Sequence, residues 1–515
     1  MIQSSIAYAN PILPGFYPDP SITRAGDDYY LVCSSFEYFP GVPIFHSNDL
    51  IHWTQIGHVL DRSSQLDTRM HNSSDGIYAP TIRYHNGTFY MITTDVRGIG
   101  NFYVTAVDPA GPWSDPILIP YGGIDPSLMF DEDGKVYVTT QQGADYDSHA
   151  IQYEIDIVTG KALSEPVVIW TGDGGPWTEG PHLYKINGMY YIMSASGGTA
   201  KEHREIIGRS SNPYGPFERL PEPILTHNEM DHPIQYLGHA DLIEDHNGDW
   251  WAVFLGVRLV GAGYTVLGRE TFLAPVSWNE AGWPLIDNNE GTVRLSMSVP
   301  RVPVSSPQPV NSGRDDFDEV DLPFAWTFLR NPALGSWSLS ERPGWLSLRG
   351  QSRSLNEPGE VAFIGRRQQH IQAEWSTLLE FKASMAGEEA GLCARLNEQA
   401  HYEIMLGQKN GQRVITAYLT AKGLTEVAAE VVITAESVYL KIQAELTQYS
   451  LFYSLDGQEW LKLATGSAYL LSPQAVEGNG FTGVVIGLYA TGNGKTSTEP
   501  ACFDWFDYHS LGGSL

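Results

Sequence analysis

The sequence repeats one short pattern five times within its first 250 residues. Each copy opens at a turn, continues into an aliphatic residue, and reaches two strand-forming, mostly aromatic residues ten or eleven positions after its start. The copies begin at Asp19, Ala79, Asp125, Gly180 and His239. Apolar segments that meet across such turns predict β-hairpins. The starts are 60, 46, 55 and 59 residues apart, which leaves room for about four short strands per copy and is typical of β-propeller blades.

The chain changes character near residue 300. A stretch rich in proline and serine, residues 303–309, is typical of a linker. Beyond it, alternating segments such as 414–419 lie between turns and predict a β-sandwich. We therefore expect an all-β protein with a propeller over residues 1–300, a linker over 301–314, and a β-sandwich of jelly-roll or concanavalin-like type over 315–515.

Charge and composition exclude several classes of partner. The formal net charge is −29, from 31 basic and 60 acidic residues, so we expect neither nucleic acid nor a membrane as a partner. No stretch approaches the roughly 20 apolar residues of a membrane span, and the first residues lack the pattern of a signal peptide. The three cysteines, Cys33, Cys393 and Cys502, have no spacing typical of a disulfide framework or a zinc site. These features favour the cytoplasm, although a signal peptide already removed would leave no trace. They are also compatible with a homo-oligomer as well as a monomer.

Equivalent positions in propeller blades form a ring around the central channel, so the five starts should lie together at one mouth of it. This ring holds Asp19, Ala79, Asp125 and His239, and Glu179 lies directly before the fourth start. Three carboxylates in one funnel are costly, because like charges repel and each needs solvation or hydrogen bonds. Glycoside hydrolysis uses such groups, one as acid and another as base or nucleophile. The alternative is that each aspartate merely caps backbone N–H groups of a turn.

Several longer motifs resemble glycoside hydrolase family 43, and the resemblance covers essentially the whole chain. It is closest to the two-domain β-xylosidase and α-L-arabinofuranosidase members. The motifs that carry it are residues 10–21 (NPILPGFYPDPS), 34–44 (SSFEYFPGVPI), 123–127 (GIDPS), 178–182 (TEGPH) and 267–271 (LGRET).

The resemblance implies a five-bladed propeller and an inverting, single-displacement mechanism. In that mechanism, Asp19 is the general base that activates water, and Glu179 is the general acid that protonates the glycosidic oxygen. Asp125 would tune and orient Glu179. Inversion requires about 6.5–9.5 Å between base and acid, so that water fits on the far face of the sugar.

The resemblance also implies residues that contact the substrate. Arg269 is expected to contact a sugar hydroxyl and to offset carboxylate repulsion, the alternative being a structural ion pair. Phe36 would flank the sugar pocket, since aromatic faces suit the apolar sides of sugar rings. Tyr78 stands where many relatives carry tryptophan, which leaves the preference for xylose or arabinose open. Phe481 is the aromatic residue that we expect the sandwich to lend to the pocket, the alternative being a core residue of a strand.

His239 raises the question of a metal ion. Family members resembling this chain often hold calcium in the central channel, so the resemblance implies Ca²⁺ there, with His239 and water near it. Calcium prefers oxygen ligands and one imidazole makes no zinc site, so His239 would organise the water around the ion. The alternative is a structural histidine. No organic cofactor is expected.

Together these observations predict an inverting exo-glycosidase that releases terminal xylose from β-1,4-xylooligosaccharides, with α-L-arabinofuranosidase activity as a second activity. Its expected partner is a xylooligosaccharide or arabinoside substrate. One alternative makes arabinofuranosides the principal substrate, which Tyr78 keeps open. Another is a non-catalytic carbohydrate-binding propeller, which would be expected to lack one of Asp19, Asp125 and Glu179, and the chain has all three.

Overall fold

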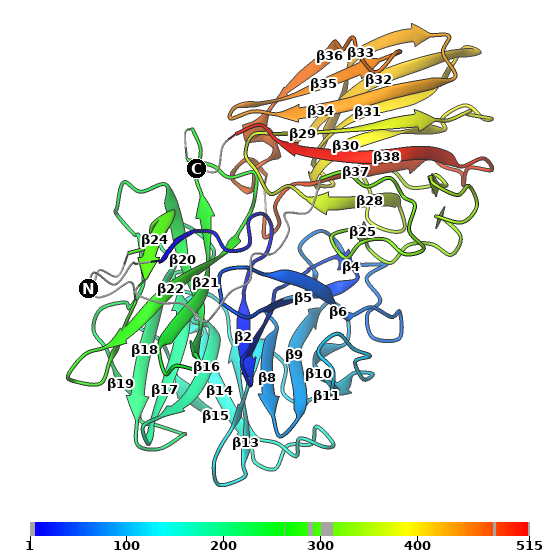
Figure 1. Cartoon of the computed structure of the whole chain (residues 1–515). Helices are drawn as coiled ribbons and strands as arrows, with labels where there is room; N and C mark the ends of the chain where they lie inside the picture. The colour runs from blue at the N-terminus through cyan, green and yellow to red at the C-terminus, as the bar shows by residue number, and fades with distance from the viewer. Residues whose placement is uncertain (1–5, 262, 287–291, 300–312, 477–479, 513–515) are drawn as a thin grey trace.

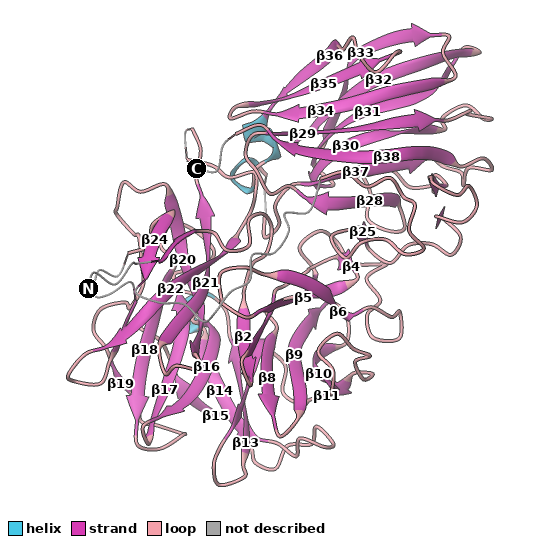
Figure 2. Cartoon of the chain, in the orientation of Figure 1, coloured by secondary structure: helices cyan, strands magenta, loops and turns pink. Residues whose placement is uncertain are grey.

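The computed structural model describes residues 6–261, 263–286, 292–299, 313–476 and 480–512. Its strands form two bodies, a lower one from the first half of the chain and an upper one from the second half (Figure 1). Nearly all of the regular structure is β-strand, and the helices within the described residues are three short 3₁₀ segments (Figure 2). No helix in this part of the chain is long and apolar enough to cross a membrane. The prediction of an all-β fold is confirmed.

The lower body is a five-bladed propeller, and each blade is an antiparallel sheet made from one continuous piece of chain. The strands are β2 (Ser21–Ala25), β3 (Asp28–Val32), β5 (Gly41–Ser47) and β6 (Thr54–Leu60) in blade 1; β7 (Gly76–Ile77), β8 (Thr81–His85), β9 (Thr88–Val96), β10 (Gly100–Ala106) and β11 (Ile117–Leu118) in blade 2; β12 (Ile124–Phe130), β13 (Val136–Gln142), β14 (His149–Glu154) and β15 (Val167–Trp170) in blade 3; β16 (Glu179–Ile186), β17 (Met189–Ser196), β18 (Arg204–Ser210) and β19 (Glu218–Arg219) in blade 4; and β20 (Ile234–Glu244), β21 (Trp250–Arg258), β22 (Glu270–Trp278) and β23 (Pro284–Ile286) in blade 5.

The repeated sequence pattern forms the inner hairpin of each blade. In blade 1, for example, Ile22 of β2 lies opposite Leu31 of β3, and both side chains are buried. The inner strands β2, β8, β12, β16 and β20 each pack against the inner strands of the neighbouring blades, so they form a closed ring. This ring places the five starts of the repeat around one channel, as the spacing predicts.

No described strand is shared between blade 5 and blade 1, so other contacts close the propeller. Near the N-terminus, β1 (Ile6–Ala9) pairs with β24 (Ser296–Val299), which follows blade 5. Leu13 forms a β-bridge with Thr271 of β22, and the Asn10 side chain donates a hydrogen bond to the Leu273 carbonyl oxygen at 2.9 Å. The segment before blade 1 is therefore tied to blade 5.

The upper body is a sandwich of an eight-stranded and a seven-stranded sheet, which confirms the predicted concanavalin-like domain. In the first sheet the order is β33 (Leu424–Ile433), β32 (Gln412–Ala421), β31 (Ala400–Lys409), β30 (Glu389–Asn397), β37 (Val485–Thr491), β28 (Ala362–Arg367), β25 (Thr327–Leu329) and β4 (Tyr38–Phe39). In the second the order is β26 (Trp337–Ser338), β27 (Leu346–Leu348), β38 (Ala501–Ser510), β29 (Ala373–Glu380), β34 (Ser437–Ala444), β35 (Gln448–Ser454) and β36 (Leu461–Ser467). Strands β29 and β34 alternate strictly between buried and less buried residues, as expected where one face of a sheet covers a core.

The two bodies share a strand that the sequence did not reveal. Strand β4 belongs by sequence to the first blade, yet it pairs with β25 and forms the edge of the eight-stranded sheet. The Thr327 side chain donates a further hydrogen bond to the Phe39 carbonyl oxygen at 3.1 Å. The predicted linker, residues 301–314, lies outside the described residues except for its last two positions, so the domain boundaries stay a prediction.

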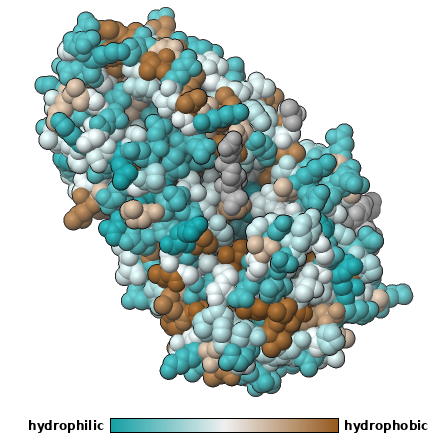
Figure 3. All heavy atoms as spheres, turned by 180° about the vertical axis from the view of Figure 1, so that it is seen from behind, coloured by the Kyte–Doolittle hydropathy of each residue, from teal (hydrophilic) through white to brown (hydrophobic). Residues whose placement is uncertain are grey.

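The face of the molecule opposite to that of Figure 1 is mostly hydrophilic. Seen from behind, hydrophilic residues cover most of the molecule, and the larger apolar groups gather over the propeller at the lower end (Figure 3).

Candidate active site

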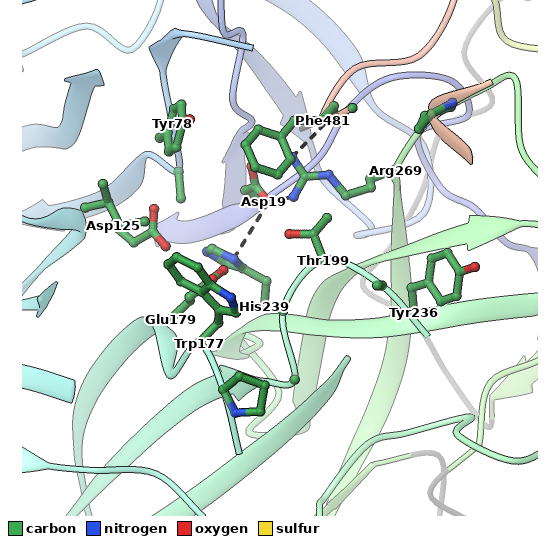
Figure 4. A pocket seen from close by; sticks show the side chains of 18 of the residues that line it. Asp19, Tyr78, Asp125, Trp177, Glu179, Thr199, Tyr236, His239, Arg269 and Phe481 are labelled. Carbon is green, nitrogen blue, oxygen red and sulfur yellow. Dashed lines mark hydrogen bonds and ion pairs between the residues drawn. The ribbon is translucent and has the colours of Figure 1, made fainter. Parts of the chain in front are cut away.

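All eight site residues predicted from the sequence line one cavity of about 730 Å³, which lies where the inner strands begin. The propeller contributes seven of them and the sandwich contributes Phe481. Figure 4 shows the carboxylates of Asp19, Asp125 and Glu179 around this cavity, with the guanidinium of Arg269 beside Asp19. The tertiary structure thus joins residues that lie up to 462 positions apart in the chain, from 19 to 481.

The starting residue of the repeat has an unusual backbone conformation. Asp19, Asp125 and His239 each have a φ of 53°, and Gly180 has a φ of 54°. This left-handed conformation costs a residue other than glycine about 1 kcal/mol, so it persists only where the surroundings enforce it. In blades 3, 4 and 5 the pairing register also shifts at this position, as in a β-bulge. Because bulges re-aim side chains, these starts direct their carboxylates and imidazole toward the channel.

The fourth copy needs glycine for a steric reason as well. A Cβ atom on residue 180 would lie 2.7 Å from Nε2 of His239, which is closer than a real Cβ contact. The polar side chain of this blade is therefore carried one position earlier, by Glu179. The irregularity of the repeat at Gly180 results from packing against the histidine of blade 5.

Asp19 is surrounded by hydrogen-bond donors and by a cationic side chain. Its Oδ1 atom accepts a hydrogen bond from Nη1 of Arg269 at 2.7 Å, and its Oδ2 atom accepts one from the Ser34 hydroxyl at 2.6 Å. Nδ1 of His239 lies 3.7 Å from Oδ1. Asp19 is 4% exposed, and hydrogen bonds between charged groups are stronger than those between neutral groups. These contacts hold the Asp19 side chain in a fixed orientation.

Asp125 and Glu179 are two neighbouring buried carboxyl groups whose pKa values are both raised. The backbone N–H of Gly180 donates a hydrogen bond to Oδ2 of Asp125 at 3.2 Å, which ties Asp125 to the residue next to Glu179. Burial raises the pKa of Asp125 to about 6. Burial and the negative charge of Asp125 raise the pKa of Glu179 to about 8. At neutral pH Glu179 therefore carries a proton, while Asp19 is paired with a cation. A carboxyl group that carries a proton, close to a second carboxyl group that is paired with a cation, is an arrangement suited to acid–base catalysis.

Aromatic rings form one wall of the cavity. The ring of Phe36 lies 5.1 Å from that of Tyr78 and 5.7 Å from that of Phe481, measured between centroids. The Arg269 guanidinium lies 5.6 Å from the Phe36 ring and 5.4 Å from the Phe481 ring. Phe481 precedes β37 and lies outside any strand, and its backbone carbonyl oxygen accepts a hydrogen bond from Arg269 at 3.4 Å. The sandwich therefore completes a wall with flat apolar faces next to a fixed cation.

Comparison with known proteins agrees with this geometry. The family model described as glycosyl hydrolases family 43 matches residues 8–284, and the model described as beta xylosidase C-terminal concanavalin A-like domain matches residues 314–509. The chain belongs to glycosyl hydrolase family 43. It is a glycoside hydrolase, as the sequence predicts.

Relatives share the whole architecture of this family 43 enzyme. It is 46% identical to a non-reducing end α-L-arabinofuranosidase of Bacteroides ovatus, over 98% of this chain and 95% of the relative. It is 40% identical to a xylosidase/arabinosidase of Butyrivibrio fibrisolvens, over 96% of this chain and 98% of the relative. The crystal structure of a xylan β-1,4-xylosidase from Bacillus halodurans superposes with a TM-score of 0.92 at 36% identity, over 98% of this chain and all of that one.

Other residues of the family 43 cavity were not predicted as site residues. Trp177 has a φ of 55° and a side chain that is 36% exposed, and it lies beside the turn of Gly197 and Gly198. Thr199 and Tyr236 also line the cavity, as does Gln474 of the sandwich. These residues lie in loops, near the start of a strand or, for Gln474, in a short 3₁₀ segment, where sequence periodicity carries no signal. Trp177 does carry a signal in the sequence, because it is an aromatic residue two positions before Glu179 and its flat face suits the apolar side of a sugar ring.

The residues on the propeller axis do not fit the expected calcium ion. Among the residues that the structure describes, no group of three or more His, Cys, Asp or Glu side chains is arranged to hold a metal. The carboxylate oxygen near His239, Oδ1 of Asp19, already accepts a charged hydrogen bond from Arg269. Deeper in the channel, both oxygens of Asp241 are taken by protein donors, including Arg83. Calcium needs several free oxygen ligands, and this arrangement leaves none of these carboxylate oxygens free.

Proposed function

We propose that this enzyme is an inverting exo-glycosidase that releases terminal xylose from β-1,4-xylooligosaccharides and also cleaves terminal α-L-arabinofuranosides. The observation that carries the proposal is the contrast between Glu179, whose pKa is raised to about 8, and Asp19, which is paired with Arg269 in the same cavity. The names of the relatives, which include xylosidases and arabinofuranosidases, support the choice of pentose substrates.

The proposed reaction is a single displacement. Glu179 donates its proton to the glycosidic oxygen as the bond from that oxygen to the anomeric carbon breaks. Asp19 accepts a proton from a water molecule, whose oxygen bonds to the anomeric carbon from the opposite face. Asp125 acts through Glu179, because its negative charge keeps the acid protonated and its hydrogen bond to the Gly180 N–H holds the neighbouring backbone. Arg269, Phe36, Tyr78 and Phe481 would hold the sugar.

The shape of the cavity supports action at chain ends. Its volume of about 730 Å³ falls within the range of pockets that enclose a small ligand. Residues of the sandwich, among them Gln474 and Phe481, line it together with the propeller, so the cavity is bounded by both domains. A long polysaccharide bound by an internal sugar would extend from the cavity on both sides and would have to displace these residues. Short oligosaccharides that enter by one end are the better substrates.

Turnover of two chromogenic substrates tests the proposal. We expect the enzyme to hydrolyse both an aryl β-xyloside and an aryl α-L-arabinofuranoside, and NMR should show the first sugar product with inverted anomeric configuration. The Glu218→Gln variant changes an exposed carboxylate on the rim of blade 4 and should behave as the unmodified enzyme. If neither substrate is hydrolysed, the proposed activity is wrong and the protein only binds sugars. If the product retains the anomeric configuration, the single-displacement mechanism is wrong.

A second candidate is an enzyme that acts principally on arabinofuranosides. It is favoured by the 46% identity to a relative named as a non-reducing end α-L-arabinofuranosidase. The ratio of kcat/KM for the two aryl glycosides decides between the candidates. A ratio that favours the arabinofuranoside by tenfold or more, which is about 1.4 kcal/mol of transition-state binding, would establish this second candidate.

The pH dependence should follow the proton on Glu179. Because the pKa of Glu179 is raised to about 8, kcat/KM should fall as the pH rises through about 8 and the acid loses its proton. In Asp125→Asn the negative charge that helps to raise this pKa is gone, so the alkaline limb should move to lower pH. An alkaline limb that does not move, or moves to higher pH, would contradict the electrostatic role of Asp125. Glu218→Gln serves again as the control, and its limb should not move.

A further inference from the structure

The propeller axis beneath the cavity holds an arginine side chain. Arg83 lies on β8, four residues after Ala79, a start of the repeat that has no polar side chain. Its guanidinium forms a bidentate ion pair with Asp241 of β20, with Nη1 to Oδ2 at 2.8 Å and Nη2 to Oδ1 at 3.2 Å. Asp241 follows His239 by two positions, so this pair lies one step deeper in the channel than the histidine.

The Arg83 guanidinium contacts more than one neighbouring blade. Its Nη1 donates to the Ser21 hydroxyl of blade 1 at 3.3 Å, and to its own blade at the Ile82 carbonyl oxygen at 2.8 Å. Its Nη2 lies 3.0 Å from Nδ1 of His182 in blade 4. Burial lowers the pKa of His182 to about 3, so this imidazole is neutral and accepts the bond. One cation thereby touches blades 1, 4 and 5 from blade 2.

The Asp241 carboxylate is saturated by protein donors. Besides Arg83, its Oδ1 accepts a hydrogen bond from the Tyr184 hydroxyl at 2.6 Å. Its Oδ2 accepts from the Ser21 hydroxyl at 2.6 Å and from the Ile22 N–H at 3.1 Å. The side chain is fully buried, and although burial alone would raise its pKa, the Arg83 guanidinium holds it well below its usual range. No oxygen of this carboxylate is left to bind a metal ion.

We propose that Arg83 is the built-in cation of the propeller axis, and that it acts as a positioning residue for the inner strands that carry Glu179 and His239 and for β2, which Asp19 precedes by two positions. It supplies the positive charge that a calcium ion in the channel would otherwise supply. It also joins blades 5 and 1, between which no described strand is shared. The part of this inference that concerns turnover rests on the proposed function, whereas the part that concerns metal and stability does not.

The choice of arginine has two physical consequences. A guanidinium stays protonated at every pH at which a protein is folded, and its planar fork matches a carboxylate with two hydrogen bonds. The axial charge is therefore independent of pH and of divalent cations. Because Asp241 is fully buried, loss of Arg83 would leave its negative charge without a counter-ion, which is among the most destabilising single changes.

The first test compares the unmodified protein before and after treatment with EDTA, and again after addition of Ca²⁺. We expect no change in Tm and no change in kcat for the aryl β-xyloside. A fall of Tm on chelation that Ca²⁺ restores would overturn the proposal, whether or not the protein turns over any glycoside. This measurement of Tm also separates the inference from the proposed function, because it needs no substrate.

The second test removes the axial cation. Arg83→Met should lower Tm by about 5–10 °C and kcat by at least tenfold with a nearly unchanged KM, since the sugar-binding wall stays in place. Addition of guanidinium chloride at millimolar concentration should restore part of both losses in Arg83→Met and not in the unmodified enzyme. An unchanged Tm and kcat in Arg83→Met would overturn the proposal.

Two further variants keep the second test decisive if Arg83→Met does not fold. In Arg83→Met combined with Asp241→Asn, both charges are gone, so this double variant should fold and be more stable than Arg83→Met alone. The matched control is Lys185→Ala. Lys185 also joins two blades through a buried aspartate, with Nζ 2.8 Å from Oδ1 of Asp131, but this pair lies away from the inner ring of starts. Lys185→Ala should keep its kcat and show no response to guanidinium, and a response equal to that of Arg83→Met would contradict a role specific to the axis.

Discussion

Glu179→Ala should lower kcat for an unactivated xylooligosaccharide by roughly 10³-fold, within the usual range for loss of a general acid. For an aryl β-xyloside with a nitrophenolate leaving group, the same change should cost much less, because this leaving group departs without a proton. Asp19→Ala should lower kcat by a similar factor for both substrates, since both reactions need an activated water molecule. The measurement is kcat for each variant on each substrate.

The dependence on the leaving group separates the two roles. If Glu179→Ala slows both substrates equally, Glu179 is not the acid, and if Asp19→Ala leaves either reaction unaltered, Asp19 is not the base. Asp19 also pairs with Arg269, so circular dichroism and Tm must show that the Asp19→Ala variant is folded. Glu218→Gln, on the exposed rim of blade 4, provides the control for a carboxylate change outside the cavity.

The second large effect concerns a buried charge network between the two domains. Arg395 of β30 is fully buried and lies 3.6 Å from Oε1 of Glu37, which is also fully buried and belongs to the first blade by sequence. The same guanidinium donates hydrogen bonds to the Tyr38 hydroxyl at 3.1 Å and to the Ser73 hydroxyl at 2.7 Å. Arg395→Met should therefore lower the free energy of unfolding by about 3–5 kcal/mol, because Glu37 loses its nearest counter-charge.

This loss should depend on pH in a defined direction. Burial raises the pKa of Glu37 even with Arg395 present, and removal of Arg395 raises it further. In Arg395→Met the folded state then binds a proton that the unfolded state has released, so stability should fall as the pH rises above the usual range of glutamate. Urea unfolding at several pH values measures the effect, and a deficit that is constant or grows toward acid pH would contradict it.

The control for Arg395 is another arginine–glutamate pair in the sandwich. Arg349 and Glu341 form two hydrogen bonds, at 2.7 and 2.6 Å, but their side chains are 28% and 40% exposed. Arg349→Met should cost at most about 1 kcal/mol, as exposed pairs usually do. Arg395→Met should also raise KM, because Ser74 joins this network to the cavity: its N–H donates to Glu37, and its hydroxyl accepts from the Phe481 N–H.

Much of the architecture could be predicted because the signals are local. A hairpin depends on residues that are near one another in sequence, and five similar hairpins at blade spacing leave few folds other than a propeller. Once that ring is assumed, the starts Asp19, Asp125 and His239 must lie near one another. The prediction of Glu179 depended on the resemblance as well, since it lies one position out of step with the repeat. The steric conflict between a Cβ at position 180 and His239 explains this offset.

Loop residues and interdomain contacts could not be predicted in this way. The strand pairing of Tyr38–Phe39 with the sandwich joins residues that are 289 and 291 positions apart, and no local pattern marks it. The same holds for Gln474, whose place in the cavity depends on how the sandwich rests on the propeller. The ion pair of Arg83 with Asp241 was not predicted either. The second copy of the repeat starts at Ala79, which has no polar side chain, so nothing at its start pointed to a charged residue in the channel.

The sequence by itself determined that the chain is all-β, that five blades bring their starts together, and that three carboxylates and an arginine meet there. Only the tertiary structure decided which charged neighbours surround each of these groups. Asp19 lies against the Arg269 guanidinium, whereas burial and the negative charge of Asp125 raise the pKa of Glu179 to about 8, although both are ordinary carboxyl groups. The physical reason is that strand formation follows from short-range residue patterns, whereas a pKa depends on every charge and every dehydrated surface within a few ångströms, whichever part of the chain supplies it.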